Sequence, residues 1–283
     1  MKDTFFPKKK VLNIRGKIKA VESPVVMGIL NLTPDSFYDG GAYNSPAKIM
    51  AQAAHLYQDG AFILDLGAYS SRPGALEVTE EEEWTRLKGV IQTIKKQFPD
   101  RLIAVDTFRS EIAYRSLQEG ADMINDISGG FIDPRIWKVT AEHKAPYIAM
   151  HMKGTPSTMQ TLTQYENLSM EVLDYFIELT RRARKEGLTD LILDPGFGFA
   201  KTTEQNYELL DRLEALKPLQ NLVLVGISRK SMIYKSLGTG PSEALNGTTA
   251  LHMAALMKGA DILRVHDVKE AVESITLYHK LRG

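Results

Sequence analysis

The sequence contains no cysteine, which excludes disulfide bonds, thiolate chemistry and metal sites with cysteine ligands. It also carries no net charge at pH 7, because 35 lysines and arginines balance 35 aspartates and glutamates. A broad basic surface for nucleic acid or for an anionic membrane is therefore not expected. An anionic ligand would have to be held by a few placed cations.

Long apolar runs are missing as well. No stretch approaches the roughly 20 residues of a membrane span. The first ten residues include Lys8, Lys9 and Lys10 but lack the apolar core of a secretory signal. We therefore expect a cytoplasmic protein that has neither a membrane nor a nucleic acid as its partner.

The apolar content is sufficient for one large domain. The chain has 283 residues, 43% of them hydrophobic, and this length is typical of a single eight-fold α/β barrel. We expect residues 1–24 to form an N-terminal extension with a short β-hairpin around Val11 to Val21. Residues 25–283 are then expected to form the barrel domain.

Short aliphatic runs alternate with longer segments of helical spacing. In one such segment, Ile49, Ala53, Leu56 and Tyr57 recur at intervals of three and four, as on one buried helix face. Strict alternation predicts parallel strands joined by right-handed crossovers, and eight such units favour a (β/α)8 TIM barrel. The predicted strands are Val25 to Leu30, Ala61 to Leu66, Leu102 to Val105, Met123 to Asn125, Tyr147 to Met150, Leu191 to Leu193, Leu222 to Val225 and Ile262 to Val265.

A doubly wound sheet is the alternative architecture for this pattern. It would carry a Gly-x-Gly-x-x-Gly turn after its first strand to bind phosphate, and the sequence has none there. The barrel is therefore favoured. The polar stretch from Lys153 to Gln164 is interpreted as a long loop after the fifth strand.

The end of the first strand is unusually polar. Asn31, Thr33, Asp35, Ser36 and Asp39 follow the apolar run within a few residues. No folding requirement dictates such a loop, and the carboxyl ends of barrel strands are where barrel enzymes place their active sites. The segment is therefore a candidate part of an active site.

Chemistry-bearing residues also gather at the ends of the other predicted strands. They are Ser70, Ser71, Arg72, Asp106, Asn125, Asp126, His151, Asp194, Ser228, Arg229, Lys230, Arg264 and His266. Each also has a purely structural interpretation: Asp106 as a helix cap, Asn125 and Asp194 as turn residues, Arg264 as the partner of a helix carboxylate, Lys230 as a solvated lysine. Convergence of so many polar groups at one barrel mouth favours a site, because buried charges without partners are costly.

These strand ends resemble the motifs of a known family, the dihydropteroate synthases of folate biosynthesis. The segments are Gly28-Ile-Leu-Asn-Leu-Thr-Pro-Asp-Ser-Phe-Tyr-Asp-Gly-Gly41, Ser71-Arg-Pro-Gly74, Val105-Asp-Thr107, Ile124-Asn-Asp126, Met150-His-Met152, Asp194-Pro-Gly-Phe-Gly-Phe199, Gly226-Ile-Ser-Arg-Lys230 and Arg264-Val-His-Asp-Val268. They extend from the first predicted strand to the last. The resemblance implies a transferase that joins a pterin methyl pyrophosphate to p-aminobenzoate.

The resemblance also implies roles for individual residues. The pterin pocket would contain Asp106, Asn125, Met150, Asp194, Gly226 and Lys230, and the pyrophosphate site Asn31, Ser71, Arg72, Arg264 and His266. The p-aminobenzoate pocket and lid loops would contain Thr33, Pro34, Asp39, Ser71, Arg72, Pro73, Phe199 and Ser231. We expect Asp194 to accept both N–H groups of the pterin edge, and Asn31 to contact a Mg2+ cofactor.

The implied reaction is a dissociative displacement. Pyrophosphate departs first, and the aryl amine then attacks the methylene cation that remains on the pterin. The residues expected to act in catalysis are Asn31, Asp106, Lys230, Arg264 and His266. Such a cation has to be protected from water, so the loops after the first two strands are expected to act as a lid.

The chain departs from the family pattern at two places. After the second strand it has Gly67-Ala-Tyr-Ser-Ser-Arg-Pro-Gly74 where the family commonly reads Gly-Gly-Glu-Ser-Thr-Arg-Pro-Gly, so Ala68, Tyr69 and Ser71 differ. After Phe199 it has Ala200 where a glycine is common, and alanine restricts the backbone more than glycine does.

Two other functions share part of this pattern. A methylpterin-dependent methyltransferase domain would have the same barrel and the same Asp and Asn contacts, and a pterin-binding barrel without activity could retain the pocket alone. The family resemblance also implies sulfonamide-type inhibitors and a homodimer formed through the last helices. Met253, Leu256 and Met257 are candidates for that interface, although their spacing also suits packing against the barrel.

Overall fold

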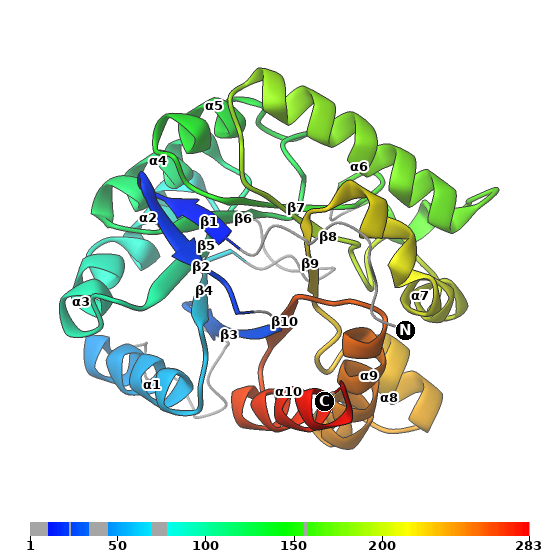
Figure 1. The fold of residues 1–283 in the computed structure, drawn as a ribbon. Coiled ribbons are helices and arrows are strands. Elements are labelled where there is room, and N and C mark those ends of the chain that lie inside the picture. The colour runs from blue at the N-terminus through cyan, green and yellow to red at the C-terminus, as the bar shows by residue number, and fades with distance from the viewer. Residues whose placement is uncertain (1–10, 23, 34–44, 70–77, 156–157, 283) are drawn as a thin grey trace.

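The computed structural model describes residues 11–22, 24–33, 45–69, 78–155 and 158–282. Eight parallel strands close into a barrel in the order β10-β3-β4-β5-β6-β7-β8-β9 (Figure 1). The barrel strands are β3 Val25–Asn31, β4 Ile63–Gly67, β5 Leu102–Asp106, β6 Met123–Asp126, β7 Tyr147–Met150, β8 Leu191–Asp194, β9 Leu222–Val225 and β10 Ile262–Val265. The predicted TIM barrel and all eight of its strands are thus confirmed, and the doubly wound sheet is excluded.

The helices form an outer ring around the barrel (Figure 1). They are α1 Pro46–Gln58, α2 Glu80–Leu87, α3 Val90–Gln97, α4 Ser110–Glu119, α5 Arg135–Glu142, α6 Leu168–Lys185, α7 Thr203–Asp211, α8 Ser231–Leu237, α9 Leu245–Met257 and α10 Val268–Arg282. Shorter 3-10 turns lie at Met159–Thr161, Leu213–Leu219 and Pro241–Glu243. In the described part of the chain, no helix has the length and apolar character needed to cross a membrane.

Successive residues of each strand face opposite sides of the sheet, and this separates the core into two main parts. Leu64 and Leu66 of β4 belong to the larger cluster between the barrel and its helices. Ile63 belongs to a second cluster that fills the barrel interior. By the same alternation Asp65 and Gly67 are directed inward. The barrel interior is therefore polar toward the carboxyl-terminal ends of the strands and apolar toward their amino-terminal ends.

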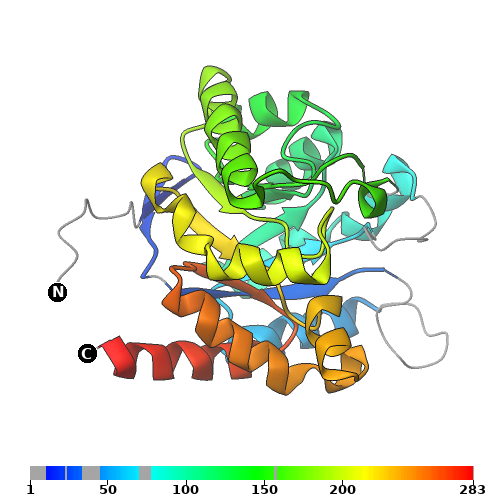
Figure 2. The ribbon, with the colours of Figure 1, turned by 90° about the vertical axis from the view of Figure 1, so that its right-hand side faces the viewer.

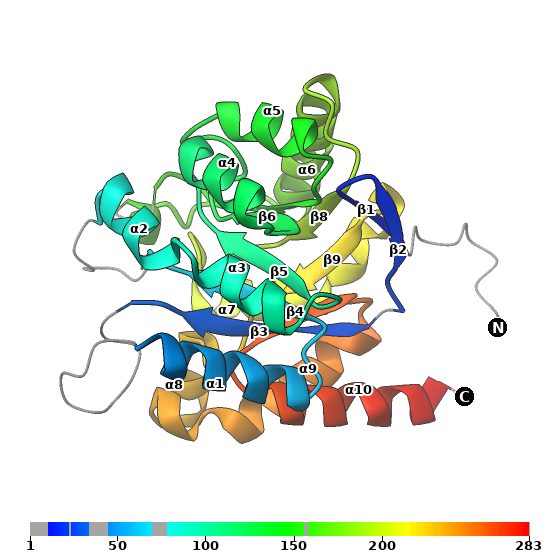
Figure 3. The same cartoon turned by 90° about the vertical axis from the view of Figure 1, so that its left-hand side faces the viewer.

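A two-stranded antiparallel sheet precedes the barrel, as predicted. It consists of β1 Val11–Ile14 and β2 Lys17–Ala20. Leu12, Ile14 and Val21 pack into the inner cluster of the barrel. Figure 3 shows this hairpin at the end of the barrel from which β3 starts, and Figure 2 shows the same arrangement from the other side. The hairpin therefore covers the amino-terminal end of the barrel, so a site is expected at the opposite end.

Candidate active site

Strand register brings the predicted residues of the first strands to one level. Asn31 of β3 pairs with Gly67 of β4, Gly67 with Asp106 of β5, and Asp106 with Asn125 of β6. On the other side of the barrel, Asp194 of β8 pairs with Met150 of β7. The polar residues predicted from separate strand ends thus share the carboxyl-terminal end of the barrel.

An arginine and two aspartates form the centre of this ring. Nε and Nη2 of Arg264 each lie 2.6 Å from Oδ2 of Asp65, and Nη2 also donates to Oδ2 of Asp106 at 2.9 Å. The same oxygen of Asp65 accepts a hydrogen bond from Nδ2 of Asn125 at 3.1 Å. Arg264 therefore pairs with carboxylates of strands, and the alternative pairing with a helix carboxylate is wrong.

Asp65 was not among the residues that the sequence singled out. It lies in the middle of a strand, where the argument from strand ends does not reach. The available signal was a charged residue inside the wholly buried strand Ile63–Gly67, because buried charges are rare unless they are paired.

Burial shifts the titration of this network. Desolvation raises the pKa of Asp106 above its ordinary value, Arg264 opposes that shift, and the neighbouring carboxylates of Asp65, Glu83 and Asp126 add to it. Burial also opposes the charge on Arg264, but Asp65 and Asp106 outweigh it and raise the pKa of the guanidinium. Arg264 consequently stays cationic at every working pH.

Asp106 is also not a helix cap. Helix α4 begins at Ser110, and the amide of Ser110 donates to Oδ2 of Asp133 at 2.9 Å. Asn125 makes its side-chain bond with Asp65 and not with a turn. Both side chains are thus committed to the barrel mouth.

Asp194 was considered both as a turn residue and as a buried residue of the site, and its position is compatible with both. It is buried at the end of β8, and its Oδ1 accepts the amide of Gly196 at 2.8 Å, which is a turn contact. Desolvation raises its pKa, and Lys230 and the Gly196 amide oppose the shift. A carboxylate has about four acceptor sites, so this turn leaves acceptors for a ligand.

Lys230 and Phe199 form one wall of the mouth. The ammonium of Lys230 donates to the carbonyl oxygen of Phe197 and lies 4.7 Å from the centre of the Phe199 ring. Burial lowers the pKa of Lys230 to about 8, although Asp194 opposes the shift. Lys230 is therefore not a freely solvated lysine. Ser231, the next residue, begins α8 and is half-buried.

A small apolar cluster lies beside these polar groups. Met150 belongs to it, and Phe108 and Phe199 pack against it. Gly226 lies next to Arg264, and a Cβ there would be in ordinary contact, 3.9 Å from the Cβ and Cδ of the arginine. A flat heteroaromatic ring would find apolar contacts and in-plane hydrogen bonds together, as small-molecule sites require.

His266 and Asn31 stand at the edge of this mouth. Nδ1 of His266 lies 3.0 Å from the hydroxyl of Ser228, whose oxygen also accepts the His266 amide at 3.2 Å. The imidazole is exposed, so it can meet a ligand from solution. Oδ1 of Asn31 would be 3.2 Å from a Cβ at Gly67, so the glycine keeps space open beside that oxygen.

Asn31 is the residue expected to contact a magnesium ion. The described residues contain no cluster of three His, Asp or Glu side chains able to hold a metal. Mg2+ is commonly held by one or two protein oxygens together with waters and phosphate oxygens, so a single amide oxygen from Asn31 fits that chemistry.

The loops after the first two barrel strands include five of the predicted site residues. Pro34, Asp39, Ser71, Arg72 and Pro73 lie outside the described residues. Thr33, the last described residue before the first of these gaps, is half-buried.

The two departures from the family pattern have visible consequences. Ala200 takes a left-handed conformation with φ 49°, which glycine adopts more easily, and its carbonyl accepts the hydroxyl of Tyr165 at 3.0 Å. Tyr69 packs edge-on against Phe108 with ring centres 5.2 Å apart, and the guanidinium of Arg109 lies 5.6 Å from the centre of the Tyr69 ring.

A buried lysine supports the loop after β8. It was not among the residues predicted from the sequence. Nζ of Lys201 lies 3.1 Å from the carbonyl oxygens of Gly196 and Phe199 and 3.0 Å from Nδ1 of His151. Burial lowers the pKa of Lys201 to about 7, and burial with nearby lysines lowers that of His151. His151 is therefore neutral and can accept from the lysine.

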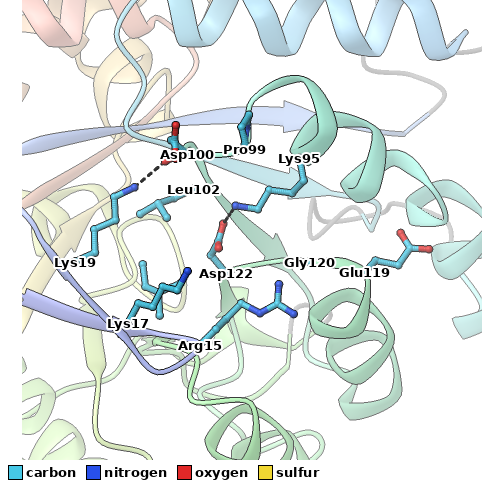
Figure 4. Close-up of a pocket in the computed structure, with 11 residues that line it drawn as sticks. Arg15, Lys17, Lys19, Lys95, Pro99, Asp100, Leu102, Glu119, Gly120 and Asp122 are labelled. Carbon is cyan, nitrogen blue, oxygen red and sulfur yellow. Dashed lines mark hydrogen bonds and ion pairs between the residues drawn. The ribbon is translucent and has the colours of Figure 1, made fainter.

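A cavity of about 660 Å³ lies at the opposite end of the barrel (Figure 4). It is lined by Arg15, Lys17 and Lys19 of the hairpin and by the ion pair between Lys95 and Asp122, whose charged atoms are 2.6 Å apart. None of the predicted site residues lines it, so it is separate from the mouth.

The family model described as "Pterin binding enzyme" matches residues 27–266. The chain therefore belongs to the pterin-binding enzymes. The barrel and the polar mouth described above are those of a member of this class.

Two relatives show to which group within this family the chain is similar. The dihydropteroate synthase of Synechocystis sp. is 49% identical over 247 residues, which cover 86% of this chain and 85% of the relative. That of Escherichia coli K12 is 46% identical over 254 residues, covering 89% of both. Within its family the chain is thus grouped with the dihydropteroate synthases, which are transferases.

Solved structures agree. The Yersinia pestis dihydropteroate synthase with a sulfonamide drug superposes with a TM-score of 0.90 at 38% identity, covering 96% of this chain and 99% of the other. The Xanthomonas albilineans enzyme with 4-aminobenzoic acid gives 0.89 at 36% identity, covering 97% and 98%.

Proposed function

We propose that the residues at the barrel mouth carry out the dihydropteroate synthase reaction by a dissociative displacement. In this reaction 6-hydroxymethyl-7,8-dihydropterin pyrophosphate and p-aminobenzoate give 7,8-dihydropteroate and pyrophosphate. The observation that carries the proposal is the ring of Asp106, Asn125, Asp194 and Arg264 beside an apolar wall.

The pterin ring would be held in its plane by buried polar groups. Asp194 accepts the two adjacent N–H groups of the pterin edge, while Asp106 and Asn125 bond the opposite side and Lys230 donates to the ring. Met150 supplies the apolar contact. Charge-assisted hydrogen bonds of this kind contribute roughly 1.5 to 3 kcal/mol each, and a wrong ring would leave the buried charges without partners.

The pyrophosphate would be held at the edge of the mouth by Arg264, His266 and Asn31. The hydroxyl of Ser228, 3.0 Å from Nδ1, orients the imidazole of His266 in this arrangement. A magnesium ion bound by the oxygen of Asn31 would neutralise charge on the leaving oxygens.

Bond breaking would precede bond making. The C–O bond to the pterin methylene breaks and pyrophosphate leaves with the electron pair. The amine of p-aminobenzoate then forms the new C–N bond and loses one proton. Arg264 stabilises the charge that develops on the departing oxygen, and the half-buried side chains of Phe199 and Lys230 help to keep water from the cation.

The second substrate would lie toward the loops. We place p-aminobenzoate against Thr33, Phe199, Lys230 and Ser231, and the loop residues Pro34, Asp39, Ser71, Arg72 and Pro73 complete the pocket in this proposal. Sulfonamides would compete there, in line with the sulfonamide and 4-aminobenzoic acid complexes of the relatives.

We also propose a cytoplasmic homodimer formed through the last two helices. Met257 of α9 and Leu277 and Leu281 of α10 are 49%, 60% and 69% exposed, and exposed apolar side chains of this kind suit a partner surface. Leu256 is 1% exposed and packs in its own subunit, so it is not an interface residue. Sedimentation of a Leu277→Glu, Leu281→Glu variant should give monomers, and an unchanged mass would place the interface elsewhere.

A coupled assay tests the proposed chemistry. Purified protein with Mg2+ and both substrates should release pyrophosphate only when p-aminobenzoate is present, with stoichiometric dihydropteroate. Release of pyrophosphate without the amine at the same rate would contradict a role for the amine in trapping the cation. Pterin binding without any release would favour the non-catalytic barrel, and methyl transfer from a methylpterin to a corrinoid or thiol acceptor would favour the methyltransferase.

A further inference from the structure

Asp65 is a fully buried charged group below the mouth. Its side chain is fully buried in the middle of β4, and one of its oxygens, Oδ2, holds both Nε and Nη2 of Arg264. Among the described residues, its other oxygen has no hydrogen-bond partner. A carboxyl group this buried can remain ionised only if its cation stays in place, because an unpaired buried charge is strongly unfavourable.

The contacts of Arg264 show what the pairing does to the guanidinium. The group uses Nε and Nη2 toward Asp65 and Asp106, and in the described part of the chain Nη1 makes no hydrogen bond. One edge of the planar group is thus fixed against the strands. The Nη1 side is the part left for a ligand.

We propose that Asp65 is a positioning residue that fixes the guanidinium of Arg264 so that its Nη1 side faces the pyrophosphate. The inference rests on the proposed function, in which Arg264 binds that anion. Asp65 itself is too buried to contact either substrate and acts only through the arginine. Asn125, which donates to the same oxygen, keeps Asp65 in its rotamer.

Simple electrostatics predicts the opposite effect of removing Asp65. A carboxylate near an anion site repels the anion, so its neutralisation should strengthen pyrophosphate binding. If Asp65 positions Arg264, neutralisation should weaken it, because the arginine is then free to adopt other rotamers or to pair with Asp106 alone. The sign of the change therefore separates the two explanations.

The test is to bind two ligands to Asp65→Asn. They are the pterin pyrophosphate and the corresponding pterin alcohol, which lacks the anion, both measured by calorimetry with the intact protein and Mg2+. We expect the dissociation constant of the pyrophosphate to rise at least tenfold and that of the alcohol to change less than threefold. Steady-state kinetics should show the same split, with a raised KM for the pyrophosphate and little change in the KM for p-aminobenzoate.

The matched control is Asp122→Asn at the other end of the barrel. Asp122 is 4% exposed, its Oδ2 accepts the amide of Ile103 at 2.8 Å, and Lys95 lies 2.6 Å from the same oxygen. The control therefore removes the charge of an aspartate that is buried and paired with a cation as Asp65 is. It should lower the melting temperature and leave both dissociation constants unchanged.

Arg264→Met supplies a second comparison that does not require Asp65→Asn to fold. Removing both members of a buried ion pair is less destabilising than removing one. The double variant carries both Asp65→Asn and Arg264→Met. If Asp65 acts only through Arg264, this double variant should bind the pyrophosphate as weakly as Arg264→Met alone. A further change of more than threefold would mean that Asp65 has an independent effect, and the inference would be wrong.

The remaining outcomes are also decisive. Tighter pyrophosphate binding by Asp65→Asn, or an equal loss for both ligands, would overturn the positioning role. Weak binding by Arg264→Met together with normal binding by Asp65→Asn would overturn this inference alone. Normal binding by Arg264→Met would instead refute the proposed anion site.

Discussion

Gly196 is the position at which a single added methyl group should damage the proposed pterin pocket most directly. It follows Asp194 and Pro195, has φ 72°, and donates its amide to Oδ1 of Asp194. A Cβ at this position would lie 2.0 Å from the carbonyl oxygen of His151 and 3.1 Å from its carbonyl carbon. Because the obstacle is backbone, no change of side-chain rotamer can relieve the contact.

The cost of Gly196→Ala has two parts. The left-handed conformation costs alanine ~1 to 2 kcal/mol. Forcing atoms into a packed region costs a further ~1 to 3 kcal/mol. Together these predict a loss of about 2 to 5 kcal/mol, which corresponds to a fall of about 3 to 8 °C in melting temperature for a chain of this size. The displaced amide should also release Asp194, so pterin affinity should fall more than tenfold.

Gly238→Ala is the matched control. Gly238 ends α8 with φ 66°, and a Cβ there would meet nothing within 4 Å. This variant carries only the conformational cost, which lowers the melting temperature by about 2 to 3 °C, and it should bind pterin normally. Calorimetric scans and pterin titrations of both variants are the assay. If Gly196→Ala melts no lower than the control and binds pterin with unchanged affinity, the contact with His151 does not hold the loop as described.

Other predictions address the charges around the pocket. Asp194→Asn should weaken pterin binding more than tenfold in calorimetry and leave the circular dichroism spectrum intact, and an unchanged dissociation constant would remove Asp194 from the pocket. Since burial lowers the pKa of Lys230 to about 8, its ammonium is present below that pH, so pterin affinity should fall as pH rises from 8 to 9.5. Lys230→Met should lack that fall, and a fall of the same size in the variant would assign it to the ligand. Lys201→Met should raise the KM for p-aminobenzoate several-fold by freeing the Phe199 carbonyl, with little change in melting temperature, and unaltered kinetics would contradict the anchor. Chelation of Mg2+ should abolish turnover reversibly and spare binding of the pterin alcohol, while full activity in excess chelator would exclude the metal.

The barrel was predictable because its signals are local. Each strand is a short aliphatic run followed by a helix with apolar residues at intervals of three and four, and Val25 to Leu30 or Leu222 to Val225 needs no partner to be recognised. The positions of the candidate site residues at strand ends were predictable for a related reason. Parallel strands place all their carboxyl ends on one face, so position in the chain translates into position in space.

Contacts between distant side chains were not predictable. Asp65 lies inside a strand, and only closure of the barrel brings it to Arg264, 199 residues later in the chain. Lys201 resembled a surface lysine at the end of a glycine-rich loop, and its burial depends on His151 from another strand. The left-handed conformation of Ala200 depends on the same packing, and the sequence indicated only that a glycine would be easier there.

Barrel closure also affects the order in which the charges of the mouth come together during synthesis. The barrel closes when β10 pairs with β3, whose partner positions Val25 and Ile262 are far apart in sequence. Because β10 also carries Arg264, the cation at the centre of the mouth comes from the last strand of the barrel to be synthesised. Contacts between such distant segments form late. A nascent chain with every other strand in place would therefore have a mouth lined by Asp65 and Asp106 without their arginine. Such a mouth would lack the guanidinium that is proposed to bind pyrophosphate until β10 is in place.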